Sequence, residues 1–150
     1  MKAMVYYGNQ DIRFENIPEP KLKQSELKIK VEYCGICATD IEEYQYGPNF
    51  ISHEKPNNLT GKQLPLVTGH EITGTVVETY NDQNPEIIGQ KVVLFGTITC
   101  EKCSYCESEM TNQCPDMATV GFCQNGGFAE YLSWPIKNTL PIPKNEKTNI

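Results

Sequence analysis

Several features that would point to common functions are missing from this 150-residue sequence. It contains no Gly-x-Gly-x-x-Gly segment, so the usual phosphate-binding loop for a dinucleotide is excluded. It has no block of lysine or arginine and carries a net charge of −6, so neither nucleic acid nor an anionic membrane surface is an expected partner. No apolar run reaches the length of a membrane-spanning helix.

The composition is that of one globular domain. Hydrophobic residues make up 39% of the sequence and charged residues 21%, and the chain is long enough to bury its own core. The first seven residues have no targeting character and begin directly as strand-like sequence. Without an export signal, the cysteines are expected to be reduced, which predicts a cytoplasmic protein.

Alternation of apolar and polar residues predicts mostly short strands. The clearest is 26–33, where Leu27, Ile29, Val31 and Tyr33 share one face. Further strands are expected at 2–7, 12–16, 70–80, 91–98 and 128–134. The pattern predicts a mainly β fold, a closed or partly closed antiparallel barrel.

Little helix is expected. Thr39 and Glu42 fit a capping box, so a short helix is predicted after Cys37. Residues 47–64 are polar and interrupted by proline and glycine, and we interpret them as a long surface loop. Residues 135–150 show little pattern, and their prolines argue against a continuous helix.

Four of the seven cysteines fall within fifteen residues, with the spacing C-x2-C-x2-C-x7-C. Two-residue gaps let successive thiolates surround one point, and the seven-residue return is long enough for a helical turn that brings back the fourth. A tetrahedral zinc site with four thiolates at about 2.3 Å needs this geometry and leaves no open position. The spacing therefore favours a structural zinc site. Its ligands are Cys100, Cys103, Cys106 and Cys114.

Two other interpretations of these cysteines stay open at this point. Disulfides would suit a small secreted scaffold, but the cysteine count is odd and no signal peptide is visible. An iron–sulfur cluster is the sharper alternative, because C-x2-C-x2-C followed by Cys114-Pro115 is similar to the ferredoxin run, although the ferredoxin gap is three residues.

Cys37, His70 and Glu71 form a second candidate metal site. Thiolate, imidazole and carboxylate all suit zinc, and three protein ligands with one open position are typical of a catalytic site. Taken singly, His70 is better explained as a satisfied buried histidine, and Cys37 as a small buried hydrophobic residue. Spacing alone does not join residues 37 and 70.

A resemblance joins them. Five motifs occur along the chain in a recognisable order. They are Gly35-Ile36-Cys37-Ala38-Thr39-Asp40, Gly69-His70-Glu71-Ile72-Thr73-Gly74, Gly89-Gln90-Lys91-Val92, the cysteine lobe, and Gly127-Phe128-Ala129-Glu130-Tyr131. On these motifs the chain resembles the N-terminal catalytic domain of the zinc-dependent medium-chain alcohol dehydrogenases over essentially its whole length, and its loop residues 46–50, 59–61 and 64–66 are similar to the 2,3-butanediol dehydrogenase branch.

The resemblance implies the fold and its partners. It implies a GroES-like, partly open β-barrel over residues 1–150, with a short zinc lobe and few short helices. It also implies a Rossmann domain beyond residue 150 that binds NAD(H). The implied enzyme oxidises a secondary alcohol or vicinal diol to the ketone, binds only small-molecule alcohols, diols or ketones and the cofactor, and forms a homo-oligomer at full length. The 150 residues alone are expected to be inactive.

The resemblance also assigns roles to residues. It implies that Cys37 and His70 bind catalytic Zn²⁺, with Glu71 beside the metal and a further ligand beyond residue 150. It implies that the Thr39 hydroxyl relays the substrate proton and that the Asp40 carboxylate orients the zinc-bound His70. The lobe would hold structural Zn²⁺.

Some residues depart from the family pattern. The family often has histidine at the position of Glu42, which here fits a helix cap, and Tyr80 stands where the extended pattern prefers glycine or alanine. His53 has no motif support and is interpreted as a surface residue. Cys34 and Cys123 are interpreted as buried structural thiols.

Three functional hypotheses follow. The first is an NAD(H)-linked zinc alcohol dehydrogenase, with sorbitol- or threonine-type members of the superfamily as variants. The second is an iron–sulfur electron carrier, which would be coloured. The third is a non-enzymatic interaction module stabilised by structural zinc.

Overall fold

A computed structural model describes residues 1–143 and contains ten strands and two α-helices in that range. The strands run over β1 Lys2–Gly8, β2 Asp11–Asn16, β3 Glu26–Gly35, β4 Leu66–Val67, β5 Glu71–Thr79, β6 Lys91–Leu94, β7 Thr97–Ile98, β8 Ala118–Thr119, β9 Tyr131–Pro135 and β10 Thr139–Pro141. The helices are α1 Ala38–Tyr46 and α2 Ser104–Glu107, and four short 3₁₀ turns lie between the other elements.

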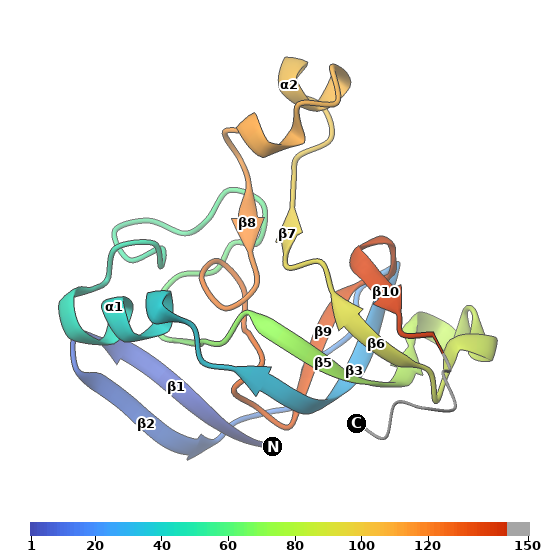
Figure 1. The fold of residues 1–150 in the computed structure, drawn as a ribbon, viewed down its shortest axis with the longest axis horizontal. Helices are drawn as coiled ribbons and strands as arrows, with labels where there is room; N and C mark the ends of the chain where they lie inside the picture. The colour runs from blue at the N-terminus through green and yellow to red at the C-terminus, as the bar shows by residue number, and fades with distance from the viewer. Residues whose placement is uncertain (144–150) are drawn as a thin grey trace.

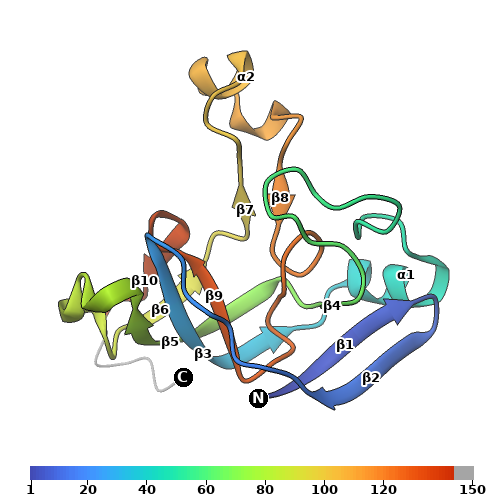
Figure 2. The same ribbon diagram turned by 180° about the vertical axis from the view of Figure 1, so that it is seen from behind.

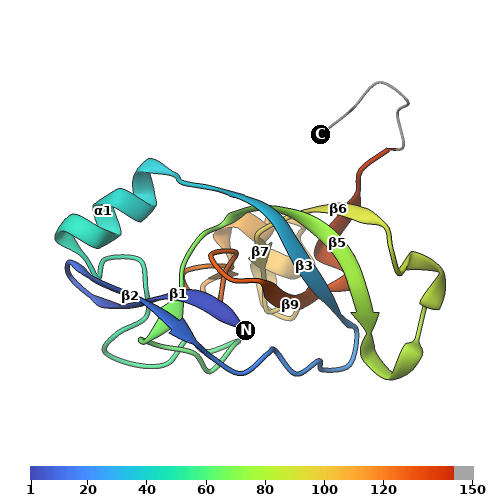
Figure 3. The same ribbon diagram turned by 90° about the horizontal axis from the view of Figure 1, so that it is seen from below.

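The strands form antiparallel sheets that curl into a half-barrel (Figures 1 and 3). The largest sheet has the order β10-β6-β5-β3-β9, and the second has the order β2-β1-β4. The segment before β9 joins them, because the Met4 N–H donates to the Phe128 carbonyl and the Glu130 N–H donates to the Lys2 carbonyl. The predicted partly open β-barrel with few short helices is confirmed.

The core lies between the curled sheets. Its main cluster is built from buried side chains of β3, β5, β6 and β9, with Val120 from the segment after β8. These side chains are Leu27, Ile29, Ile72, Val76, Val92, Leu94, Leu132 and Trp134. Burial of this apolar surface is the main force that holds β3 and β5, the strands that carry the candidate site, in one sheet.

The alternation in β3 holds for only part of the strand. Leu27 and Ile29 are buried as predicted, but the register against β5 shifts between Val31 and Tyr33. A bulge of this kind re-aims the side chains that follow it. Tyr33, expected on the buried face, is therefore 60% exposed, which corrects the prediction.

The predicted helix after Cys37 is confirmed as α1, but its cap is not where the sequence placed it. Cys37 is the N-cap residue, and its N–H donates to Asp40 Oδ2 at 2.9 Å. Thr39 and Glu42 lie inside the helix, so the predicted capping box between them is wrong. The Asp40 carboxylate performs the capping because it stands at the third helical position, where a side chain reaches back to the N-cap amide.

The predicted strand 91–98 is interrupted. It divides into β6 and β7 at Phe95 and Gly96, where the chain leaves the large sheet and enters the cysteine lobe. The Phe95 carbonyl accepts a hydrogen bond from Trp134 Nε1 at 3.0 Å, and the Phe95 N–H donates to Asn138, so side chains and neighbouring loops replace the strand ladder there.

Residues 47–64 contain no helix or strand, as predicted, although Ile51 within them is buried. In the segment 135–150, residues 136–138 form a 3₁₀ turn and β10 follows, while 144–150 lie outside the described residues. No helix within residues 1–143 is both long and apolar enough to span a membrane.

Candidate metal centres

The four clustered cysteines lie in a lobe, residues 99–117, that projects from the half-barrel on β7 and β8 (Figures 1 and 2). Two residue pairs, Thr97 with Thr119 and Ile98 with Ala118, close the base of this lobe. Within it, α2 and a 3₁₀ turn fold the chain back on itself. The Sγ atoms of Cys100, Cys103, Cys106 and Cys114 all lie within 4.8 Å of one another.

The spacing of these sulfur atoms fits a single metal ion. Two thiolates of a tetrahedral zinc site with Zn–S distances of about 2.3 Å lie about 3.8 Å apart. Cys100 Sγ and Cys106 Sγ are 4.0 Å apart, and the Cys100 N–H points at Cys114 Sγ at 3.4 Å. Donor type and spacing therefore both fit zinc.

Strand pairing brings the second cluster together. Cys37 follows the end of β3, and His70 and Glu71 stand at the start of β5. Because β3 and β5 are antiparallel neighbours, with Gly35 paired directly to Glu71, residues that are far apart in sequence meet at this end of the sheet. The ligand atoms of Cys37, His70 and Glu71 all lie within 4.8 Å of one another.

Two glycines make this approach possible. A Cβ atom on Gly35 would lie 2.2 Å from Glu71 Oε2, so any other residue would displace the carboxylate. Gly69 has φ +88°, in the left-handed region that favours glycine, and a Cβ there would lie 2.7 Å from Cys34 Sγ. The glycines that precede Cys37 and His70 are thus required by the backbone of the site.

Asp40 links the two halves of the cluster. Its Oδ2 accepts the Cys37 N–H, and its Oδ1 faces His70 Nδ1 at 3.5 Å, which is longer than a formed hydrogen bond. Within residues 1–143, both of these facing atoms are buried without a hydrogen-bond partner. An imidazole whose Nδ1 is aligned on a carboxylate presents Nε2 as its metal-binding nitrogen. The orphaned pair and the mixed sulfur, nitrogen and oxygen donors therefore fit zinc in a site with an open position.

Both the sequence and the fold match a known family of proteins. Residues 23–144 match the alcohol dehydrogenase GroES-like domain family. The chain belongs to this family. Among its relatives, the (R,R)-butanediol dehydrogenase of Bacillus subtilis is 38% identical over 137 residues, which cover 89% of this chain and 38% of that protein. The L-threonine 3-dehydrogenase of Yersinia enterocolitica is 33% identical over 97% of this chain and 40% of its own length.

Solved structures of the family agree in fold. The crystal structure of 2R,3R-butanediol dehydrogenase from Bacillus subtilis superposes with a TM-score of 0.85 at 34% identity, over 95% of this chain and 40% of that one. An alcohol dehydrogenase from Escherichia coli, solved in complex with NADH, gives a TM-score of 0.81 at 26% identity, over 96% of this chain and 39% of that one. The chain thus spans about two fifths of the relatives it matches, and its family and fold, as predicted, are confirmed.

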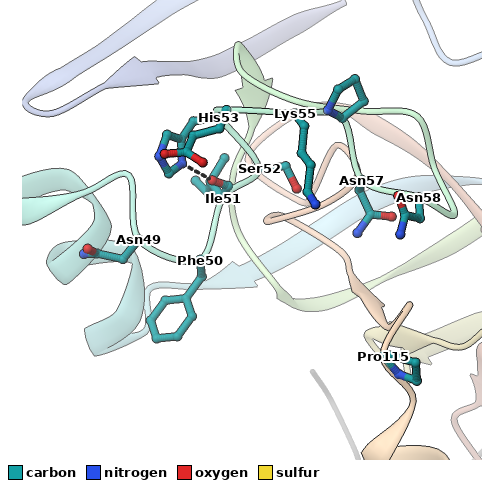
Figure 4. Close-up of a pocket in the computed structure, with 11 residues that line it drawn as sticks. Asn49, Phe50, Ile51, Ser52, His53, Lys55, Asn57, Asn58 and Pro115 are labelled. Carbon is teal, nitrogen blue, oxygen red and sulfur yellow. Dashed lines mark hydrogen bonds between the residues drawn. The ribbon is translucent and has the colours of Figure 1, made fainter.

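The other residues singled out in the sequence lie at several places within the GroES-like domain. Thr39 Oγ1 is 3.6 Å from Cys37 Sγ, beside the second cluster. His53 is exposed in the loop 47–64, where its Nδ1 lies 3.0 Å from the Ile51 carbonyl oxygen (Figure 4). Cys34 and Cys123 are half-buried free thiols outside both clusters, and burial raises the pKa of the Cys34 thiol to about 11.

Two further residues of this region, Phe122 and Glu43, were not found from the sequence. The Phe122 ring lies 4.7 Å, centroid to centroid, from the His70 ring. Glu43 is 1% exposed, although its glutamate neighbour Glu42 is exposed. The spacing from Asp40 to Glu43 places both carboxylates on one helical face, which was the available signal. No local pattern connects Phe122 with His70.

Proposed function

We propose that the chain is the metal-binding part of a longer zinc-dependent, NAD(P)-linked alcohol dehydrogenase that acts on a secondary alcohol or vicinal diol. The observation that carries the proposal is the three-donor cluster of Cys37, His70 and Glu71, which leaves one position open, in a chain of this family. A closed four-cysteine site alone would support only a structural role. The cofactor-binding domain would lie in the remaining length of the longer protein.

In this proposal the two clusters have different tasks. Cys100, Cys103, Cys106 and Cys114 hold structural zinc, while Cys37, His70 and Glu71 hold catalytic zinc. The chemistry supplied by these groups when bound is Lewis acidity toward the alcohol oxygen from zinc and acceptance of a hydride by the nicotinamide.

The chain's own side chains then orient ligands and move a proton. The Asp40 carboxylate accepts the Cys37 N–H and faces His70 Nδ1, so it is placed to orient both ligands once metal is bound. Thr39 lies next to the Cys37 sulfur, and its hydroxyl can accept the proton of the alcohol while it gives its own proton to water, so it relays this proton and ends unchanged.

The substrate class is supported by the names of the relatives. One solved relative acts on 2R,3R-butanediol, a vicinal diol in which both alcohols are secondary. A threonine-type substrate is the second candidate, because an L-threonine 3-dehydrogenase also matches 97% of this chain. Oxidation of any of these alcohols yields a ketone.

The test uses the longer, zinc-loaded protein with NAD⁺ or NADP⁺ and a panel of 2,3-butanediol, sorbitol and L-threonine. We expect reduced cofactor to accumulate at 340 nm with at least one diol or amino alcohol, and the activity to disappear in Cys37→Ser and His70→Asn. No turnover with any of the panel would contradict the substrate class. Unchanged activity in both variants would contradict the assignment of catalytic zinc to Cys37 and His70.

Elemental analysis of the 150-residue chain after gel filtration separates the metal hypotheses. One zinc per chain would indicate a filled lobe and a second cluster that needs a further ligand. Two would indicate that Cys37, His70 and Glu71 retain metal by themselves. Iron with visible absorption would contradict the dehydrogenase proposal and support an electron carrier.

A further inference from the structure

Glu43 is the buried carboxylate that the proposed mechanism does not use. It lies on the inner face of α1, one helical turn after Asp40, and is 1% exposed. An ionised carboxylate is seldom buried unless hydrogen bonds replace its water. The groups that supply those bonds show what Glu43 holds in place.

The carboxylate binds the beginning of the loop 47–64. The Asn49 N–H donates to both oxygens of Glu43, at 3.0 and 3.1 Å, and the Phe50 N–H donates to Oε1. The backbone carbonyl of Glu43 accepts hydrogen bonds from the Tyr6 hydroxyl at 2.7 Å and from the Gly47 N–H at 2.9 Å. Glu43 therefore joins β1, α1 and the loop at one point.

The far part of the loop is tied to the segment that returns from the cysteine lobe. Asn58 Nδ2 donates to Asp116 Oδ1 at 2.7 Å, and the Thr60 hydroxyl donates to the Cys123 carbonyl. Between the Glu43 anchor and these contacts, the loop borders a polar pocket of about 320 Å³ (Figure 4). With its far part held in this way, the direction in which the loop leaves α1 depends on Glu43.

Phe50 is the side chain that this anchor aims. In Figure 4 its ring points away from the polar side chains of Lys55 and Asn57. The ring is 62% exposed and makes an edge-to-face contact with Phe122, with centroids 6.1 Å apart. Phe122 in turn packs against the His70 ring. A row of three rings thus leads from the Glu43 anchor to a candidate zinc ligand.

We propose that Glu43 is a positioning residue, which fixes Phe50 so that Phe50 and Phe122 form an aromatic wall beside His70 for the apolar part of an alcohol substrate. The role of the wall in binding an alcohol rests on the proposed function. The structural coupling from Glu43 to His70 does not. It narrows the substrate class to alcohols that carry small apolar groups next to the reacting carbon, because an aromatic face offers little to a fully hydroxylated or phosphorylated chain.

The coupling can be tested on the 150-residue chain by NMR, because the sequence contains only two histidines, His53 and His70. In Glu43→Gln the side chain loses its negative charge and one of its two acceptor oxygens, so amide exchange at Asn49 and Phe50 should accelerate about tenfold or more. The imidazole signals of His70 should also shift. When the Phe50 ring moves, the Phe122 ring that contacts it should move too, which changes the ring current at His70. Glu42→Gln, on the exposed side of the same helix, is the matched control and should reproduce the wild-type spectra.

A second variant keeps the test decisive if Glu43→Gln does not fold. Phe50→Ala removes the exposed ring but keeps the backbone N–H that binds Glu43, so Asn49 should stay protected while the His70 signals shift. Faster exchange at Asn49 in Glu43→Gln with unchanged His70 signals would reduce Glu43 to a loop anchor and overturn the proposal. Unchanged His70 signals in Phe50→Ala would overturn it too.

In the longer enzyme, Glu43→Gln should raise KM for 2,3-butanediol about tenfold with a smaller change in kcat, because binding of the apolar groups is weakened more than the reaction at the metal. An equal fall in kcat with an unchanged KM would contradict the wall. If no alcohol is oxidised at all while the NMR coupling is present, the proposed function fails and the positional role of Glu43 stands.

Discussion

The cysteine lobe and the cluster of Cys37, His70 and Glu71 are built from the sequence in opposite ways. The lobe takes all four donors from one stretch of fifteen residues, and two residue pairs join its base strands, β7 and β8. The second cluster takes its donors from positions 33 residues apart and depends on eight residue pairs between β3 and β5. We therefore expect the first to need metal to hold its shape, and the second to keep its shape through the packing of the core.

Because of this difference, we expect loss of metal to affect the two sites differently. Structural zinc contributes folding free energy directly, because a short loop with few buried apolar side chains cannot order itself alone. The half-barrel around the second cluster has its own buried core, so we expect its donors to stay in place without metal. Cys103 and Cys37 are both N-cap residues of helices, which allows the same substitution to be compared at the two sites.

The largest effect is expected for Cys103→Ser. We expect the chain to lose one zinc and the lobe, residues 99–117, to lose its protection from amide exchange, since the binding free energy of structural zinc is on the order of 10 kcal/mol. Amides in β3 and β5 should stay protected. Zinc analysis and hydrogen exchange by mass spectrometry measure both results. Cys123→Ser is the control, and unchanged zinc content in Cys103→Ser would contradict the assignment.

Cys37→Ser should separate metal binding from folding at the second cluster. Serine is a good N-cap residue, so α1 should persist and the free energy of unfolding of the metal-free chain should change by less than about 0.5 kcal/mol. Zinc affinity at this cluster should fall by more than the ~10–100-fold that loss of an outer partner costs. Competition with a chromophoric chelator and urea unfolding give the two values. A large loss of metal-free stability would show that the two clusters do not differ as argued.

Asp40→Asn should weaken the second metal centre without removing a ligand. The amide oxygen can still accept the Cys37 N–H, but the negative charge that faces His70 is lost, so zinc affinity should fall by about 10–100-fold. The same chelator competition measures it, and the zinc content of the lobe serves as the internal reference. An affinity equal to that of the wild-type chain would mean that Asp40 serves only as a helix cap.

The contrast between the two centres also explains how much the sequence could predict. The lobe was predicted from spacing alone, because its donors are neighbours along the chain. The pairing of Cys37 with His70 needed a family resemblance, since the antiparallel register of β3 and β5 is a property of the whole sheet. The strands were predicted well where one face is buried, as at Leu27 and Ile29.

The failures have local physical causes. The bulge after Val31 turns Tyr33 outward, and no residue type in β3 marks it. Asp40 and Glu42 are both spaced to cap a helix start, Asp40 at Cys37 and Glu42 at Thr39. Which of them caps α1 depends on the residue at which β3 ends. The burial of Glu43 depends on the amides of Asn49 and Phe50, which approach only after the loop 47–64 has folded.

Tyr6→Phe should have the smallest effect and tests how firmly β1 holds α1, the helix that follows Cys37. The variant loses the hydrogen bond from the Tyr6 hydroxyl to the Glu43 carbonyl, which should lower the free energy of unfolding by about 1 kcal/mol. Tyr46→Phe, at the exposed end of α1, is the matched control and should change it by less than about 0.5 kcal/mol.

The pH dependence gives this variant a signature of its own. Burial, and then the charge of Glu43, raise the pKa of Tyr6 from 10.0 to about 12. Because the folded protein favours the neutral phenol, this contribution is complete below pH 10 and is lost as the pH rises toward 12. The free energy of unfolding, measured with urea across this pH range, should therefore fall less steeply with pH in Tyr6→Phe than in the wild-type chain. Parallel curves would mean that Tyr6 ionises as easily in the folded state as in the unfolded state, and that the support of Glu43 from β1 is weaker than the contacts indicate.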